Sequence, residues 1–330
     1  MEKPHQLSTP VLTRPPGFTH NKVTFPYEDS ILPMNHTVHH SFCPVCHNHQ
    51  LDTVFVVEDF SITNEKFQLL ECRECAVRLT DNIPDESSIG RYYQSSAYVS
   101  HSNSKKGLIN RLYHFARRFT LESKRSFIQK ATGRGVGMHL DVGSGTGSFV
   151  HVMEKAGWSS TGLEPDEAAR ETAAKLYKAD VFPADHLFSL PNGTYNAITM
   201  WHVLEHVHRL DEYITQLKKL LAPGGKLIIA VPNYTSADAE HYGRYWAAYD
   251  VPRHLYHFSP TSMRQLMERH GMRVVKTKPM WLDSFYVSML SEKYKKGSFL
   301  KALYVGLVSN MKTVLNRERC SSLIYVAEIN

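Results

Sequence analysis

The stretch LDVGSGTGSF, residues 140–149, joins two segments of different character. Residues 138–142, MHLDV, predict a short buried strand, and residues 149–157 have the pattern of a helix that stops at Gly157. Glycines between them let the backbone turn tightly and approach a ligand closely. Alone this loop is weak evidence, because it fits a pyrophosphate-binding turn as well as a plain strand-to-helix connection.

The spacing of the loop and three acidic residues narrow the choice. The glycines follow a GxGxG pattern, with Ser148 where a dinucleotide-binding loop has its third glycine. Asp141 enters the loop, and Glu164 ends the next expected strand, where it can accept hydrogen bonds from both ribose hydroxyls. Asp185 follows the third expected strand and could meet an adenine amino group. These positions predict a nucleoside-containing ligand.

Strand and helix patterns alternate from residue 138 onward. Short connections between alternating strands and helices predict a parallel sheet covered on both faces. Further strands are expected at 160–164, 179–183, 196–201, 226–232, 272–278 and 321–329.

Four successive motifs carry a family resemblance. LDVGSGTGSF, GLEPDEAA, PADHLFSLPNGTYNAITMWHVLEHV and LAPGGKLIIAVPN, within about 138–232, resemble those of class I S-adenosylmethionine-dependent methyltransferases. The resemblance implies an α/β, Rossmann-like sheet of seven strands in the order 3-2-1-4-5-7-6, with the last strand antiparallel. It also implies S-adenosylmethionine as the cofactor.

The resemblance also assigns cofactor contacts to residues of this chain. It implies that the glycine loop surrounds the methionine part, that Glu164 holds the ribose, and that Asp185 and His186 border the adenine. The full set of implied cofactor-binding residues is Asp141, Gly143, Gly145, Gly147, Glu164, Asp185, His186 and Trp201.

Two CxxC pairs lie ahead of this region, at Cys43, Cys46, Cys72 and Cys75. Two knuckles 25 residues apart can close a tetrahedron of thiolates around Zn²⁺, which predicts a structural zinc ribbon. A pair of reduced, metal-free turns is the alternative, and neighbouring His47 and His49 could substitute as ligands. Cys320 stands alone and is expected in the core.

The ribbon points to one branch of the superfamily. CPVC…CREC, YYQSSAYVSHSNSKKG and WAAYDVPRHLYHFSP are similar to bacterial methyltransferases with an N-terminal zinc ribbon, of the type 11 and type 23 kind. We therefore expect a loosely ordered leader (1–40), the ribbon (41–82), a basic helical connector (83–137) and a methyltransferase domain (138–330) with an insertion (282–318). The branch shares no single acceptor.

Composition limits the class of protein. The chain has 330 residues, of which 42% are hydrophobic, and a formal charge of +6. It has no apolar run of about 18 residues and no apolar leader, so a cytoplasmic protein is expected. Residues 105–130 carry eight basic side chains against one acid, which could contact phosphate, although a solvated helix face is the commoner outcome.

Residues that would handle the acceptor are expected in two loops. His206 follows the fourth strand, and His254 lies in the PRHL sequence; either could act as a general base on a hydroxyl. Arg253 could bind an anionic acceptor through its guanidinium, or pair with Asp250 only to fix the loop. The apolar helical stripe near Leu300 could cover the acceptor pocket, form a dimer or membrane-surface face, or be buried in the core.

These features predict methyl transfer to a small-molecule or biosynthetic-intermediate acceptor. O-methylation by in-line displacement is the first expectation, and C-methylation of a nucleotide-linked sugar is the second. An RNA methyltransferase that docks nucleic acid on its ribbon and basic helix is the alternative, and a homodimer remains open. A binding module without turnover would not need Asp141, Glu164 and the glycines together.

Overall fold

The computed structural model describes residues 37–93 and 108–330, with side chains omitted for the first part of the helix that starts at Leu108. These residues belong to one compact unit, Asn35–Asn330. The expected leader therefore lies almost wholly outside the described residues, as do most of the basic side chains between 105 and 118. In the described part of the chain, no helix is long and apolar enough to cross a membrane.

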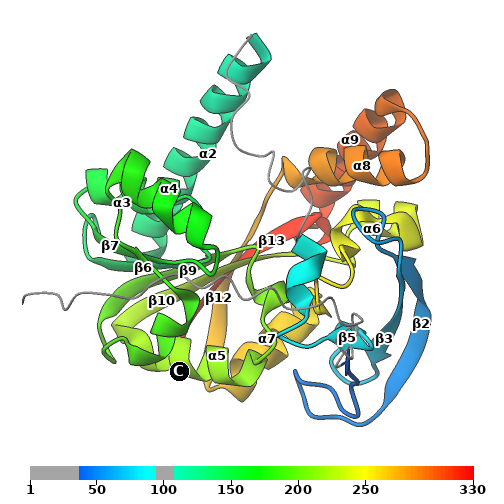
Figure 1. Cartoon of the computed structure of the whole chain (residues 1–330), viewed down its shortest axis with the longest axis horizontal. Helices are drawn as coiled ribbons and strands as arrows, with labels where there is room; N and C mark the ends of the chain where they lie inside the picture. Colours follow the sequence, from blue (N-terminus) through cyan, green and yellow to red (C-terminus); the bar gives the residue numbers. More distant parts are fainter. Residues whose placement is uncertain (1–36, 94–107) are drawn as a thin grey trace, which may run out of the picture. The chain divides into compact units, whose positions relative to one another are not determined.

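A seven-stranded sheet forms the centre of the molecule (Figure 1). Its order is β12-β13-β10-β9-β6-β7-β8, and β13 runs antiparallel to both of its neighbours. Numbered along the chain from β6, this order is 3-2-1-4-5-7-6, so the expected fold is confirmed. The strands are β6 (Met138–Val142), β7 (Ser159–Leu163), β8 (Val181–Phe182), β9 (Tyr195–Trp201), β10 (Leu221–Pro232), β12 (Met272–Pro279) and β13 (Ser322–Ile329).

Both faces of this sheet are buried, which explains its nearly continuous apolar strands. Alternate residues of β10 enter different clusters: Ile229 packs in one and Ile228 in the other. Phe127 and Phe149 lie in the second cluster, so the helices that carry them cover that face. The helices beside the sheet are α2 (Leu108–Thr132), α3 (Ser148–Lys155), α4 (Glu167–Tyr177), α5 (Leu210–Leu220) and α7 (Pro260–Arg269).

Local capping explains where two of these helices begin. Asp166 precedes α4, and its side chain accepts a hydrogen bond from the backbone N–H of Ala169. Ser259 and Ser262 form a reciprocal capping box at the start of α7, with Pro260 in the first turn.

The cysteine-bearing segment forms a second, four-stranded sheet. Its strands are β2 (Leu51–Glu58), β3 (Lys66–Cys72), β4 (Arg78–Thr80) and β11 (Tyr256–His257), in the order β11-β4-β3-β2. A separate two-stranded sheet pairs β1 (Thr37–Val38), which precedes β2 in the chain, with β5 (Ile83–Pro84), which follows β4. Because β11 comes from the second half of the chain, the ribbon is completed by the methyltransferase region.

The segment after β10 contains mostly short helical pieces and is largely buried. It comprises α6 (Ala237–Tyr242), η4 (Gly243–Tyr245) and η5 (Ala247–Tyr249). The remaining short turns are η1 (Ile89–Tyr93), η2 (Ala184–Ser189), η3 (Leu204–His206) and η6 (Arg317–Arg319). Cys320 is fully buried, as expected.

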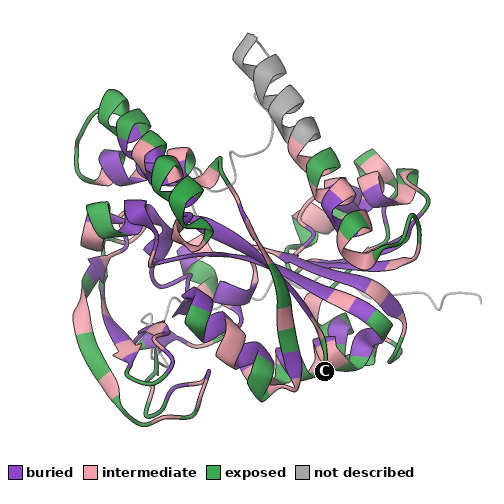
Figure 2. Ribbon diagram, turned by 180° about the vertical axis from the view of Figure 1, so that it is seen from behind, coloured by how far each residue is buried: buried purple, intermediate pink, exposed green. Residues whose placement is uncertain are grey.

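The insertion forms a helical pair, α8 (Asp283–Tyr294) and α9 (Phe299–Leu315). Core burial of its apolar stripe is the wrong expectation, because Leu300 and Tyr304 are 77% and 67% exposed. Exposed positions recur along this helical pair in Figure 2. The face of α9 that packs inward is made of small residues such as Ala302 and Gly306. A Cβ on Gly306 would lie 2.6 Å from Cδ1 of Phe285, so the close approach of the two helices requires the glycine.

Candidate active site

The glycine loop turns from β6 into α3 at the carboxyl edge of the sheet. Gly143, Gly145 and Gly147 have φ angles of 74°, 53° and 71°, a region that residues with a Cβ rarely adopt. A Cβ on Gly143 would lie 2.3 Å from Cγ2 of Val203, whereas one on Gly145 would meet no atom within 4 Å. The first glycine is therefore needed for packing, and the second borders open space where a ligand can approach.

Two acidic residues flank this loop. Asp141 is buried, and its Oδ1 accepts a hydrogen bond of 2.6 Å from Thr199. Burial raises the pKa of Asp141 to about 7, although the Thr199 hydroxyl and the nearby Lys124 charge oppose the rise. Glu164 accepts a 2.8 Å hydrogen bond from the backbone N–H of Gly145, and burial also raises its pKa. The Glu164 carboxylate thus contacts the loop directly, and the Asp141 carboxylate lies at the end of β6, where the loop begins.

Lys124 is a residue of this site that the sequence did not single out. Its ammonium lies 4.1 Å from the centroid of the Trp201 ring, and burial lowers its pKa against the opposing charges of Asp141 and Asp283. The helical spacing indicates this position, because Lys124 lies one helical turn before the apolar Ile128 and therefore on the same face of α2. Ile128 is fully buried. Lys124 therefore departs from the expectation of a solvated face.

Trp201 ends β9 next to the loop. Its ring meets Phe149 edge-on, with the centroids 5.8 Å apart, and its buried indole N–H has no hydrogen-bond partner. On the other side of the loop, Asp185 and His186 follow β8 in η2 and are both exposed, and His186 stacks on Phe182. The open space at Gly145 and the unpartnered indole fit a bound cofactor beside these residues.

The loop after β9 gathers three histidines and a glutamate. His202 lies between two carboxylates, with Nδ1 3.4 Å from Glu205 Oε1 and Nε2 3.3 Å from Asp283 Oδ2. Burial alone would lower the pKa of His202, but the two carboxylates outweigh it and raise that pKa to about 10. His202 is therefore a cation at neutral pH and a poor general base.

His206 and His254 lie side by side, although 47 residues lie between them in the sequence. Their rings meet edge-on with centroids 4.6 Å apart. Nδ1 of His206 lies 2.9 Å from the carbonyl oxygen of Arg253, and Nδ1 of His254 lies 2.9 Å from that of Ala248. Burial and the neighbouring His254 lower the pKa of His206 to about 4, so this imidazole is neutral at pH 7.

Comparison with known proteins agrees with this geometry. The model of a methyltransferase domain family matches residues 113–277, half of the chain. The chain belongs to this methyltransferase family. Its sheet order is that of the class I S-adenosylmethionine-dependent fold.

Curated relatives match over a shorter region. The ubiquinone biosynthesis O-methyltransferase of Vibrio parahaemolyticus is 35% identical over 114 residues, which is 32% of this chain and 48% of that protein. The enzyme of the same name from Caulobacter is 31% identical over 103 residues, or 29% of this chain and 41% of that one. The chain thus spans about half the length of the curated relatives it matches.

Solved structures resemble the chain at lower identity. The magnesium protoporphyrin IX methyltransferase of Synechocystis, with bound S-adenosylhomocysteine, is 16% identical with a TM-score of 0.48. The aligned region covers 74% of this chain and all of that chain.

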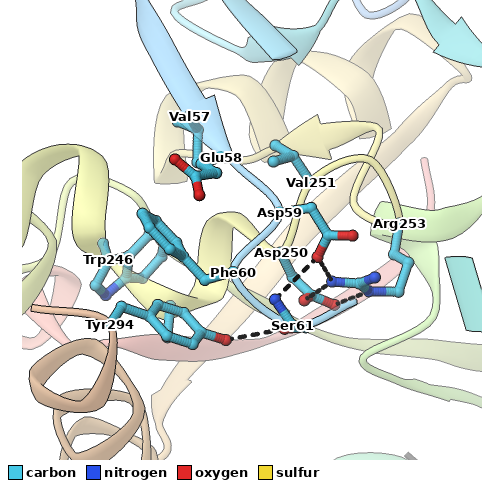
Figure 3. Close-up of a pocket in the computed structure, with 11 residues that line it drawn as sticks. Val57, Glu58, Asp59, Phe60, Ser61, Trp246, Asp250, Val251, Arg253 and Tyr294 are labelled. Atoms are coloured by element: carbon cyan, nitrogen blue, oxygen red, sulfur yellow. Dashed lines mark hydrogen bonds and ion pairs between the residues drawn. The ribbon is translucent and has the colours of Figure 1, made fainter. Parts of the chain in front are cut away.

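In this methyltransferase, Arg253 does not present a free guanidinium to an acceptor. Its side chain is 1% exposed and donates to both carboxylate oxygens of Asp250 and to Asp59 at 2.9 Å (Figure 3). It also donates to the carbonyl oxygen of Tyr92 at 2.9 Å. Asp59 directly follows the ribbon strand β2. The geometry therefore supports the alternative in which Arg253 fixes the loop, and not the expected contact with an acceptor.

The four ribbon cysteines fit a zinc ion. The Sγ atoms of Cys43 and Cys75 lie 3.5 Å apart, those of Cys46 and Cys72 lie 3.4 Å apart, and all four lie within 4.8 Å of one another. A tetrahedral ion with zinc–sulfur bonds of about 2.3 Å separates its sulfurs by about 3.8 Å. None of these cysteines forms a disulfide. The donor set thus suits closed, structural coordination.

The two neighbouring histidines have other contacts. His47 Nε2 lies 3.2 Å from Asp211, and His49 Nδ1 lies 3.3 Å from the carbonyl oxygen of Ser41. Arg269 of α7 donates to the carbonyl oxygens of Pro44 and Val45 in the first knuckle. The four cysteines are therefore the better ligand set, and the knuckle is tied to the main domain.

Proposed function

We propose that this chain transfers a methyl group from S-adenosylmethionine to an oxygen atom of a small-molecule acceptor. The observation that carries the proposal is the glycine loop, flanked by Asp141 and Glu164 at the carboxyl edge of a methyltransferase sheet. Open α/β sheets bind their ligands at that edge. The loop and both acids come from adjacent strands, β6 and β7, so they form a single surface.

The charges of the site suit the cofactor. The carboxylate of Asp141 and the ammonium of Lys124 lie near each other beside the loop. In this proposal, Asp141 pairs with the amino group of the methionine moiety and Lys124 pairs with its carboxylate. Glu164 can exchange its hydrogen bond with Gly145 for bonds from the ribose hydroxyls, and Asp185 with His186 would border the adenine. The cofactor supplies an electrophilic methyl group on a sulfonium sulfur.

An oxygen acceptor is supported by two observations. The matched relatives from Vibrio and Caulobacter are named as O-methyltransferases. In this chain, His206 lies just beyond β9, three residues past Val203, whose side chain packs on the glycine loop, and its ring pairs with that of His254. Protein groups that orient an acceptor hydroxyl toward the methyl carbon supply much of the rate of such a displacement.

Calorimetric titration with S-adenosylhomocysteine tests cofactor binding. Glu164→Ala should weaken binding by at least about tenfold, because one hydrogen bond to a charged group contributes roughly 1.5–3 kcal/mol. Glu171→Ala is the matched control, because that glutamate is exposed on α4 and pairs only with Lys175 among the described residues. Unchanged affinity in Glu164→Ala would reject the ribose contact, and no binding to the wild type would reject the function.

Transfer itself is tested with methyl-labelled S-adenosylmethionine and a panel of phenols, catechols and aliphatic alcohols. Label recovered as a methyl ether supports the proposal. Label recovered on carbon, or in RNA added as a competing acceptor, would reject an oxygen of a small molecule as the acceptor atom.

A further inference from the structure

Glu205 is an unusual buried carboxylate. Its side chain has no exposed surface, and neither carboxylate oxygen accepts a hydrogen bond from the described residues. The nearest cationic atom is His202 Nδ1, at 3.4 Å from Oε1. Leaving a buried carboxylate without hydrogen bonds is costly, so such a group normally has a partner or binds a metal ion.

Two histidines lie beside the Glu205 carboxylate. One ligand atom from each of Glu205, His206 and His254 lies within 4.8 Å of the other two. A carbonyl oxygen only accepts hydrogen bonds, so Nδ1 of His206 donates to the Arg253 carbonyl at 2.9 Å, and the Tyr93 hydroxyl lies 3.1 Å from the same nitrogen. The same argument protonates Nδ1 of His254 against the Ala248 carbonyl. Among the described residues, the hydrogen bonds of both rings use Nδ1, and Nε2 of each ring forms none.

This is the arrangement found around metal-bound imidazoles, where the second ring nitrogen donates to a backbone carbonyl and fixes the orientation of the ring. We propose that Glu205, His206 and His254 bind a divalent transition-metal ion beside the glycine loop. The ion would bind the Glu205 carboxylate in addition to the 3.4 Å contact of that carboxylate with His202. It would be a second site, independent of the four ribbon cysteines.

The donor set selects the class of ion. Two imidazoles and one carboxylate suit Mn²⁺, Fe²⁺, Co²⁺ or Zn²⁺, whereas Mg²⁺ and Ca²⁺ prefer oxygen ligands alone. Asp250 does not complete the set, because its nearest oxygen is 4.0 Å from His254 Nε2 and both oxygens bind Arg253. Three protein ligands leave open positions on the ion, as in catalytic rather than structural sites.

The open positions deepen the proposed function, on which this step rests. A hydroxyl oxygen bound to the ion loses its proton to water more readily, because the positive charge stabilises the alkoxide or phenoxide. That oxygen then forms a bond to the methyl carbon while the carbon–sulfur bond breaks, and the electron pair stays on sulfur as S-adenosylhomocysteine. This accounts for an oxygen acceptor without using the weakly basic His206 as the proton acceptor.

Titration of the zinc-containing, full-length protein with Mn²⁺ tests the site, because thiolate ligands favour zinc and the ribbon will not take up manganese. Calorimetry and the electron paramagnetic resonance signal of bound Mn²⁺ should report one ion per chain. Glu205→Gln and His254→Asn should each weaken binding at least about tenfold. His151→Asn, on α3 and away from the cluster, is the control and should leave binding unchanged.

Each titration is repeated with S-adenosylhomocysteine to separate the two proposals. Wild-type protein that binds S-adenosylhomocysteine but neither Mn²⁺ nor Zn²⁺ beyond the ribbon ion overturns the metal site and leaves the proposed function standing. Metal uptake without S-adenosylhomocysteine binding overturns the proposed function and leaves the metal site standing. If Glu205→Gln does not fold, His254→Asn decides; undiminished Mn²⁺ affinity in a folded variant also overturns the site.

Discussion

Replacing Arg253 by Met should destabilise the protein far more than its place in a surface loop suggests. The guanidinium is 1% exposed and is paired with Asp59, whose side chain has no exposed surface, and with Asp250. Met retains most of the apolar stem but removes the charge. The Asp59 carboxylate then keeps its hydrogen bonds from Ser61 and Thr63 but loses its cation.

The magnitude follows from this burial. Removing one partner of a buried ion pair costs roughly 3–5 kcal/mol, because the remaining charge stays in a poorly solvated place. For a unit of this size, each kcal/mol lowers the melting temperature by roughly 2 °C, so a fall of about 6–10 °C is expected. The double variant Arg253→Met with Asp59→Asn should recover part of the loss, because it removes the stranded charge.

Thermal unfolding followed by circular dichroism measures the effect. Arg73→Met is the matched control: Arg73 makes a two-bonded pair with Asp52, but the two side chains are 61% and 52% exposed, so a much smaller change is expected. Equal effects of the two substitutions would refute the reasoning. An unchanged melting temperature with a raised KM for the acceptor would instead restore Arg253 to substrate binding.

Three further outcomes are expected. Cys43→Ser should lower the zinc content, measured by elemental analysis, to well below one ion per chain, and full retention of zinc would contradict the ribbon assignment. Gly143→Ala should destabilise the protein by more than about 1 kcal/mol in denaturant titrations and more than Gly193→Ala does, because both glycines have positive φ but only the first meets Val203. Asp141→Asn should change the pH dependence of stability: the raised pKa of about 7 means that protonated Asp141 stabilises the fold below about pH 4, and this contribution of a few kcal/mol is lost as pH rises to 7. The free energy of unfolding of the variant should therefore rise relative to that of the wild type between pH 4 and 8. A constant difference in this free energy across that range would exclude a raised pKa of Asp141.

The order of the main sheet could be predicted only through the family resemblance, and the motifs that carry that resemblance are local stretches of sequence. Each motif contains a strand end and the turn that follows it, so Asp141 and Glu164 could be placed at one edge before any coordinates were known. The four cysteines could also be predicted as a metal site from the sequence, since the spacing within each CxxC pair brings its two thiolates close together. Residues whose role depends on their immediate neighbours are the ones that a sequence reveals.

Residues whose partners are distant in sequence could not be placed in this way. Arg253 binds Asp59, which lies 194 residues earlier, and nothing near either residue indicates the pair. Glu205 directly follows the apolar Leu204, but sequence alone does not show that its carboxylate is buried with Leu204. The outward apolar face of α9 was also hidden, because helical spacing shows that a stripe exists but not which way it points.

The position of β11 gives the cysteine-bearing ribbon sheet a second role besides stabilising its own fold. Thr80 of the ribbon strand β4 donates a 2.7 Å hydrogen bond to the carbonyl oxygen of His254, and its backbone N–H donates to that of Leu255. The Asp59–Arg253 pair holds the same loop from the residue that follows β2. The ribbon sheet thus fixes the backbone position of His254 from two sides. The four cysteines would therefore influence the proposed acceptor site by positioning this loop, and not by taking part in the reaction. Loss of the ribbon ion would be felt first in the handling of the acceptor, while the glycine loop, which is built on β6 and β7, has no strand in common with the ribbon sheet.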